Sequence, residues 1–181
     1  FITLWLFCFL SSCTKPSGEN NILLKAVYDK DPSIKRVIDS LGQYEIQILY
    51  TQIDRDKENN PVFTDYEFQV SDSVYFYPAS TVKFPVAVLA LEKLNEGKKY
   101  GGNTRFYLEG DSVETSFYKE INKIFAVSDN DAYNRLFEFM GTDDINKKLK
   151  EKALTPIRIS HRLSTPDAFN TKTKSLVIYL N

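Results

Sequence analysis

The sequence predicts an α+β domain over residues 30–181. Three patterns point to it: an amphipathic helix near the start, two alternating apolar and polar segments behind it, and several longer helical patterns after residue 80. This length is sufficient for one domain with a sizeable core. The aromatic content of 14% further predicts a core or a cleft that is rich in rings.

The first predicted elements are a helix and a hairpin. Asp31 is a candidate N-cap and Pro32 stands at the first helical position, and apolar residues follow at helical spacing until Gly42. Residues 44–53 and 61–70 alternate between apolar and polar side chains and are separated by a polar turn. These two segments therefore predict an antiparallel hairpin.

A nearly continuous apolar run at 84–94 predicts a helix that is buried on most sides. Pro85 is tolerated only near the start of a helix, which places the N-terminus of this helix close to Ser80. A glycine-rich loop at 95–106 follows, and residues 155–170 are also typical of a loop.

Three further helices and a strand complete the prediction. Helices are expected at 115–125 and at 131–141, where apolar residues recur at helical spacing before a closing glycine. Residues 142–154 predict a charged surface helix with Thr142 as its cap. The apolar stretch 174–180 is compatible with a strand.

Residues 1–12 are predicted to be a signal peptide. They end in a lipobox-like Leu-Ser-Ser-Cys, which makes Cys13 the expected lipidated residue; an uncleaved anchor and a simple secretory signal are the alternatives. Residues 13–29 then form a tether, and the domain behind it contains no cysteine. We therefore expect a lipoprotein of the cell envelope that faces the periplasm or the cell surface. Because the chain begins with Phe1, we also expect it to be a fragment.

Charge and residue counts exclude several kinds of partner. The net charge is −1 and no basic block occurs, which argues against a nucleic-acid partner. His161 is the only histidine, and with no cysteine in the domain we expect no metal site and no cofactor. We expect a monomer.

Ser80 and Lys83 lie three residues apart at the start of the apolar helix. On a helix this spacing places both side chains on one face, so that the amine can reach the hydroxyl. Burial lowers the pKa of a lysine and allows it to act as the base that a serine nucleophile needs. Alternatively, Ser80 is only a helix cap and Lys83 a surface lysine.

The spacing alone is a weak signal, because Ser12 with Lys15 and Ser116 with Lys119 match it as well. Lys15 falls in the tether and Lys119 among charged neighbours. Only Lys83 precedes an apolar helix that would bury it.

A second motif, Ser128-Asp129-Asn130, opens the helix at 131–141. It is also a plausible capping cluster. However, it follows Ser80 and Lys83 in chain order, no Gly-x-Ser-x-Gly elbow is present, and His161 is the only histidine. The sequence therefore favours a serine enzyme with a lysine base.

The segments Ser80–Ala87 and Ser128–Asn134 resemble the active-site elements of class A serine β-lactamases and the related penicillin-binding proteins. The resemblance implies an antiparallel sheet flanked by helices, with an all-α subdomain. It implies that Ser80 is the nucleophile, that Lys83 takes its proton or helps to position the group that does, that Ser128 relays a proton to the leaving nitrogen, and that Asn130 binds the amide side chain of the substrate.

Two departures accompany the resemblance. The third motif of the family, Lys-Thr/Ser-Gly, is met only by Lys172-Thr173-Lys174, which lacks the glycine and comes too early. We interpret this stretch as a decoy and expect the real motif and the C-terminal strands to lie beyond this chain. Ser164 stands where class A enzymes place the glutamate that activates water, and Asp167 with Asn170 is a possible substitute.

Three functions remain open. The first is hydrolysis of a β-lactam or a related amide or ester after acylation of Ser80. The second is a peptidase-like, penicillin-binding or esterase activity on peptidoglycan-like peptides or small esters, which the missing glutamate favours. The third is a non-catalytic surface lipoprotein that retains the fold.

Overall fold

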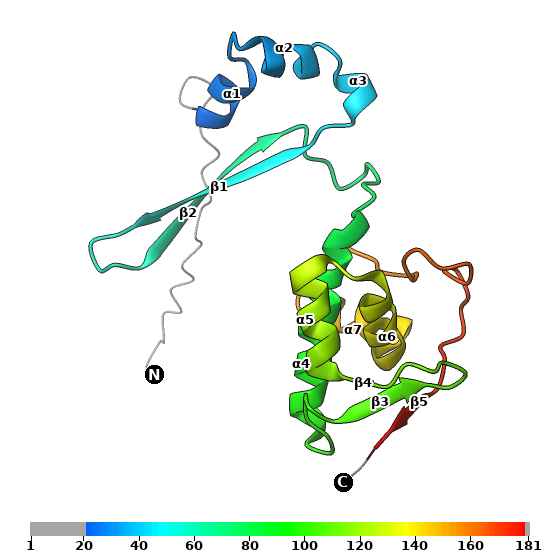
Figure 1. Ribbon diagram of the computed structural model, residues 1–181. Coiled ribbons are helices and arrows are strands. Elements are labelled where there is room, and N and C mark those ends of the chain that lie inside the picture. The colour runs from blue at the N-terminus through cyan, green and yellow to red at the C-terminus, as the bar shows by residue number, and fades with distance from the viewer. Residues whose placement is uncertain (1–20, 180–181) are drawn as a thin grey trace, which may run out of the picture. The chain divides into compact units, whose positions relative to one another are not determined.

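The computed structural model describes residues 21–179, and its chain divides into two compact units between Tyr75 and Phe76 (Figure 1). The first unit contains α1 (Ile22–Val27), α2 (Pro32–Ile38), α3 (Leu41–Tyr44), β1 (Ile48–Arg55) and β2 (Pro61–Phe68). The second contains the 3₁₀ helix η2 (Ala79–Val82), α4 (Lys83–Gly97), β3 (Arg105–Leu108), β4 (Thr115–Ser116), α5 (Phe117–Val127), α6 (Asn130–Met140), α7 (Thr142–Glu151) and β5 (Leu176–Ile178).

The first unit confirms the predicted helix and hairpin. Asp31 caps α2 by accepting hydrogen bonds from the backbone N–H groups of Ser33 and Ile34, and Pro32 is the first helical residue. The helix ends at Ile38 rather than at Gly42, and α3 follows as a separate turn. Strands β1 and β2 pair antiparallel along their whole length.

Residues 22–27 of the predicted tether form helix α1. The side chain of Asn21 caps this helix, accepting a hydrogen bond of 3.0 Å from the backbone N–H of Leu24. Leu23 and Val27 are buried against two residues of β2. Burial of this apolar face stabilises a helix too short to persist alone.

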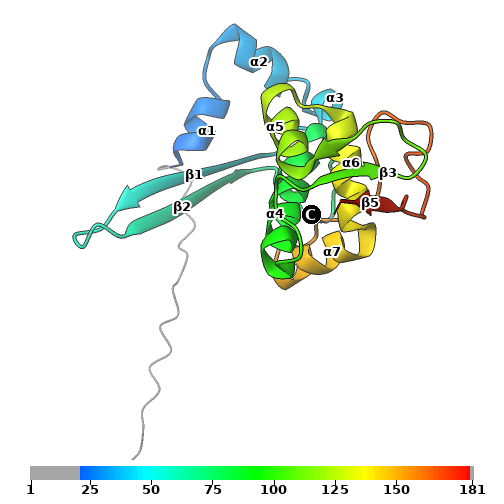
Figure 2. The ribbon, with the colours of Figure 1, turned by 60° about the horizontal axis from the view of Figure 1, so that its bottom comes forward.

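The core of the second unit lies among its helices, where α4 packs against α5, α6 and α7 (Figure 2). Pro85 occupies the first turn of α4, as predicted. The helix is buried on most sides, as predicted, and Phe84 and Val88 are exposed on the remaining side. Helices α5 and α6 confirm the two helical patterns, and α6 ends at Gly141, whose φ of 77° suits a glycine.

The prediction that Thr142 caps α7 is wrong. Gly141 holds the N-cap position, and no side-chain hydrogen bond closes this end of the helix. Asp143 and Asp144 lie in the first turn, where negative charge favours a helix start, and the rest of the helix is charged as expected.

Strands β4, β3 and β5 form a small antiparallel sheet in that order. Its central strand, β3, begins at Arg105, near the end of the predicted glycine-rich loop, whereas β5 confirms the predicted C-terminal strand. The α+β class is thus confirmed, and within residues 21–179 the strands form two small sheets.

The predicted signal peptide and Cys13 lie outside the described residues, so lipidation remains a prediction. Within the part of the chain that the structure describes, no helix has the length and apolar character needed to cross a membrane.

Candidate active site

The side chains of Ser80, Lys83 and Ser128 meet in the second unit. Ser80 lies in η2, the short helix that directly precedes α4, and Lys83 is the first residue of α4. The Lys83 amine lies 3.2 Å from Ser80 Oγ and 2.9 Å from Ser128 Oγ, and it also donates to the Ser128 carbonyl oxygen. Lys83 is only 3% exposed, whereas both serines are exposed. Neither η2 nor α4 has a side-chain cap, so Ser80 does not cap this helix.

The three oxygen partners suit both protonation states of Lys83. An ammonium group has three N–H donors, one for each oxygen. A neutral amine retains two N–H donors for the two oxygens of Ser128 and has a lone pair that faces the O–H of Ser80. The arrangement can therefore accept a proton from Ser80 without moving a side chain.

Burial lowers the pKa of Lys83, because the charged ammonium loses solvation, while the nearby Asp129 carboxylate partly offsets this by raising it. Asp129 is also the N-cap of α6, accepting a hydrogen bond of 2.8 Å from the backbone N–H of Ala132. Asp129 thus both caps the N-terminus of α6 and raises the pKa of Lys83.

Replacing Asp129 by asparagine is expected to shift the acid limb of any reaction that uses neutral Lys83 to lower pH. Asparagine is an equally good cap, so the helix end is retained while the negative charge is lost. Without that charge the pKa of Lys83 falls further, and more amine is neutral at a given pH. The pH profile of acylation would measure this shift. Asp131→Asn is the matched control with no expected shift, and an alkaline shift in Asp129→Asn would contradict the electrostatic account.

Three residues at this place have an unusual backbone. Ala79, Ser128 and Ser164 have φ values of 45°, 54° and 51°, in the left-handed region that non-glycine residues seldom occupy. Five other non-glycine residues among 21–179 also lie in this region, so the conformation by itself does not mark the site. Ala79 precedes the candidate nucleophile. Ser128, whose two oxygens contact Lys83, is the C-cap of α5, a position where a left-handed residue commonly ends a helix.

Asn130 lies at the start of α6 and faces Ser164. Its side-chain amide donates a hydrogen bond of 2.9 Å to Ser164 Oγ. Asn134, one turn further along α6, binds Leu163, the residue before Ser164. Its side-chain amide donates to the Leu163 carbonyl oxygen at 2.9 Å, and its side-chain oxygen accepts from the Leu163 backbone N–H at 2.8 Å. The segment that carries Ser164 is therefore fixed to the same helix that carries Asn130.

The loop around Ser164 is anchored by a buried ion pair. Arg162 is 3% exposed and its Nε donates to Glu138 on α6. The hydrogen bond with Glu138 is the main cause of the raised pKa of Arg162. The other guanidinium nitrogens donate to the carbonyl oxygens of Asn170 and Lys172 at 2.7 and 2.8 Å. The Lys174 backbone N–H donates to Glu138 at 2.8 Å. The Lys-Thr-Lys stretch therefore anchors this loop.

Asp167, the expected substitute for the missing glutamate, is engaged elsewhere. Its carboxylate accepts a hydrogen bond of 2.5 Å from Thr165 and pairs with Lys174 at 3.0 Å. The bond from Thr165 and the contact with Lys174 lower the pKa of Asp167 to about 2. A carboxylate with so low a pKa is a weak base, which disfavours this role.

His161 stacks against Tyr77, with ring centres 6.2 Å apart and an interplanar angle of 11°. Its Nδ1 lies 2.7 Å from the carbonyl oxygen of Arg162, which can only accept, so Nδ1 carries a proton. The Tyr133 hydroxyl donates to the carbonyl oxygen of His161 at 3.0 Å. These contacts give His161 a structural part in the loop.

The second Ser-x-x-Lys match provides an internal comparison. Ser116 is the N-cap of α5 and accepts a hydrogen bond from the backbone N–H of Lys119, whose side chain is exposed. The same spacing therefore makes Ser116 an ordinary helix cap, whereas at Ser80 it belongs to a pair in which the buried Lys83 amine lies between two hydroxyls.

Sequence reasoning missed Asn134, Glu138 and the backbone of Ala79. A charged residue within the apolar run Leu136–Met140 is the one signal that marked Glu138. Within residues 21–179, no group of three or more histidine, cysteine, aspartate and glutamate side chains is placed to hold a metal ion.

The fold and this cluster of side chains define a mixed α+β protein with a serine-lysine-serine site. The chain matches the family model described as the Beta-lactamase enzyme family over residues 31–177, and it therefore belongs to that family. Neither the curated proteins nor the solved structures contain a match.

Proposed function

We propose that the protein is a serine hydrolase that is acylated at Ser80 by a β-lactam or a related amide or ester. The observation that carries this proposal is the buried Lys83 amine between the hydroxyls of Ser80 and Ser128. Membership of the Beta-lactamase enzyme family supports it.

In the proposed reaction Ser80 Oγ attacks the carbonyl carbon of the substrate, and its proton passes to Lys83. The C–N bond of the substrate then breaks, and Ser128 delivers a proton to the leaving nitrogen. The product is an ester between Ser80 and the acyl group, which water hydrolyses to a free acid and free Ser80. Lys83 can serve both hydroxyls because it contacts both.

Asn130 is the proposed group that binds the amide side chain of the substrate. Its own amide is held by Ser164, which orients it before substrate arrives. The Ser80 backbone N–H, at the start of a helical segment, is the proposed donor for the developing oxyanion.

A second candidate is a peptidase-like or penicillin-binding activity with a long-lived acyl-enzyme. The contacts of Asp167 and the serine at position 164 favour it, since neither offers a free carboxylate base for the hydrolytic water. The acyl donors would be peptidoglycan-like peptides, which fits a monomer tethered in the cell envelope through Cys13.

A fluorescent penicillin tests acylation directly. The native protein is expected to carry the label after denaturing electrophoresis, and Ser80→Ala is expected to carry none, because the nucleophile is gone. Ser116→Ala is the matched control from the chain's other Ser-x-x-Lys pair and should label like the native protein.

Two results would contradict the proposal. Equal labelling of Ser80→Ala would place the acyl group elsewhere, and no labelling of the native protein would favour a non-catalytic member of the family. A chase with unlabelled penicillin then separates the two enzymatic candidates. Loss of label within seconds supports hydrolysis, and persistence over hours supports a penicillin-binding protein.

A further inference from the structure

A second concave region lies in the same unit, at the C-terminal end of α4. Two adjoining cavities of about 400 and 490 Å³ share Gly101, Thr104 and Tyr179 in their walls. We call them together the distal groove. The remaining walls come from the end of α4, the following turn, the start of β3 and the start of α5, and consist of Leu94, Asn95, Lys98, Lys99, Tyr100, Gly102, Asn103, Arg105 and Tyr118.

The charged residues that line the distal groove are all cationic: Lys98, Lys99 and Arg105. Arg105 pairs with Glu114 outside the lining and lies over the Tyr179 ring at 5.6 Å. The side chains of Lys98 and Lys99 form no ion pair with another residue among 21–179. The groove therefore presents uncompensated positive charge to a ligand.

Two tyrosine rings in the groove, Tyr118 and Tyr179, are half exposed, and one of them lies against a glycine. A side-chain carbon at Gly102 would lie 2.2 Å from the Tyr118 ring, so the absence of a side chain there leaves room for the ring in this position. The Tyr118 backbone N–H also donates to the Gly102 carbonyl oxygen at 2.8 Å. Tyr118 therefore offers a half-exposed aromatic face beside the backbone of Gly102.

The distal groove is separate from the candidate active site. Lys83 begins α4 and Gly97 ends it, and 15 residues of α-helix span roughly 22 Å. Figure 1 shows β3 and β5 at the end of α4 that is remote from η2. A ligand in the groove would therefore not touch Ser80.

We propose that the distal groove binds an acidic saccharide. Aromatic faces pack against sugar rings, the amides of Asn95 and Asn103 can bond to hydroxyls, and the cations pair with carboxylates. A nucleic-acid strand is disfavoured, because its binding depends on cations that neutralise successive phosphates, and only three cations line the groove. The groove thus adds a glycan-recognition function that does not depend on the chemistry at Ser80.

Isothermal titration calorimetry with tetragalacturonate tests the proposal, and maltotetraose is the neutral control of equal length. Saturable binding with a dissociation constant of about 0.1–1 mM is expected for the acidic sugar, and it should weaken at higher salt. The Ser80→Ala protein should bind equally well, so this result is independent of the proposed acylation.

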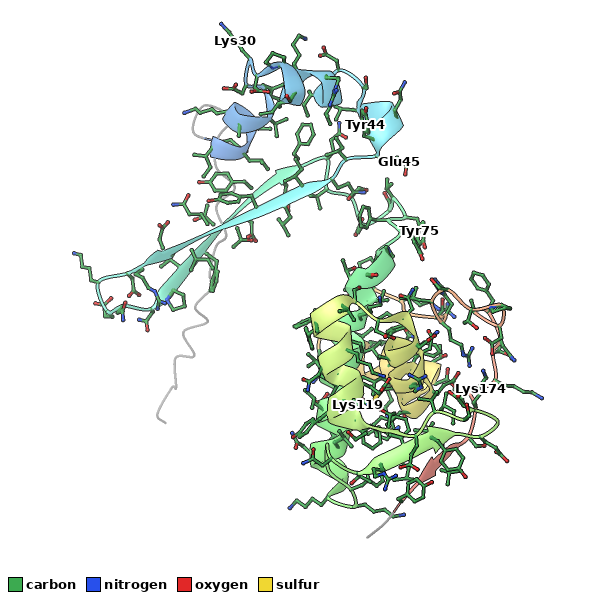
Figure 3. The ribbon with its side chains drawn as sticks, in the orientation of Figure 1. Lys30, Tyr44, Glu45, Tyr75, Lys119 and Lys174 are labelled. Carbon is green, nitrogen blue, oxygen red and sulfur yellow. The ribbon has the colours of Figure 1, made fainter. Side chains whose placement is uncertain are left out.

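Variants of the groove sharpen the test. The double variant Lys98→Gln and Lys99→Gln should weaken binding about five- to tenfold. The control is Lys119→Gln, which should not change binding; Figure 3 labels Lys119, which lies in α5. Tyr118→Ala and Gly102→Ala should each weaken binding about tenfold, and Tyr118→Phe should retain it. Thermal unfolding confirms that each variant is folded.

Three outcomes would overturn the proposal: no saturable binding below about 10 mM, equal binding of maltotetraose, or unchanged affinity in the double lysine variant. Tighter binding of a short single-stranded oligonucleotide would replace the saccharide by nucleic acid as the ligand.

Discussion

A Lys83→Met variant is expected to acylate Ser80 about 10²–10⁴-fold more slowly than the native protein, which is the contribution typical of a positioned general base. Methionine has a similar length and no charge, so it suits a position that is almost fully buried. The variant loses the amine that contacts Ser80 and Ser128 while the helix around it is retained.

The companion variant Lys83→Arg separates two explanations. Arginine keeps a cation near both serines but stays protonated at every accessible pH, so it cannot accept the proton of Ser80. If Lys83 acts as a base, Lys83→Arg should be as slow as Lys83→Met. If it acts only as a nearby positive charge, Lys83→Arg should retain much of the rate.

The rate constant for penicillin labelling, followed by stopped-flow or timed quenching, measures the effect. Lys119→Met is the control, since Lys119 has the same spacing from Ser116 but is exposed. A rate for Lys83→Met within about twofold of the native rate would exclude Lys83 from the reaction, since a general base contributes about 10²–10⁴-fold.

Replacing Arg162 by methionine is expected to lower the free energy of unfolding by about 3–5 kcal/mol, the usual cost of removing one partner of a buried ion pair. Glu138 would remain buried without its cation, and the carbonyl oxygens of Asn170 and Lys172 would lose their donor. The loop that carries Ser164 would lose one of its attachments to α6 while those from Asn130 and Asn134 remain, so acylation should also slow. Urea unfolding monitored by circular dichroism measures the stability change.

Two further variants test the cause. Glu138→Leu added to Arg162→Met removes the stranded carboxylate and should recover a good part of the loss. Lys147→Met breaks an exposed pair with Glu151 on α7 and should change the stability by less than about 0.5 kcal/mol. A loss below about 1 kcal/mol in Arg162→Met would mean that solvent or other groups replace the ion pair.

The sequence predicted most helices of the second unit because their apolar periodicity is long and their end signals are strong. Pro85 near the start of α4 and Gly141 at the end of α6 are local signals, because each restricts the backbone conformation of its own sequence neighbours. Strand β3 escaped prediction because its four residues follow two glycines and lack a clear alternation, so that its pairing with β4 and β5 defines it.

The candidate site likewise has one part that local sequence predicts and another that depends on tertiary packing. The contact between Ser80 and Lys83 follows from their spacing of three residues, and the structure confirms that Lys83 is buried. The contact between Lys83 and Ser128 depends on how α4 packs against α6, and no local pattern encodes it. The left-handed backbone at Ser164 and the anchoring of its loop by Glu138 are likewise set by tertiary packing.

Lys83 and Ser128 are 45 residues apart in the chain, and the hydrogen bond between them exists only when the second unit is folded. An unfolded chain would have to close this loop for every reaction event, at an entropic cost that native packing has already overcome. Under the proposed acylation of Ser80, a covalent inhibitor of this residue would therefore react with native molecules and not with unfolded ones. In a denaturant series, the initial rate of labelling would then follow the population of the folded second unit.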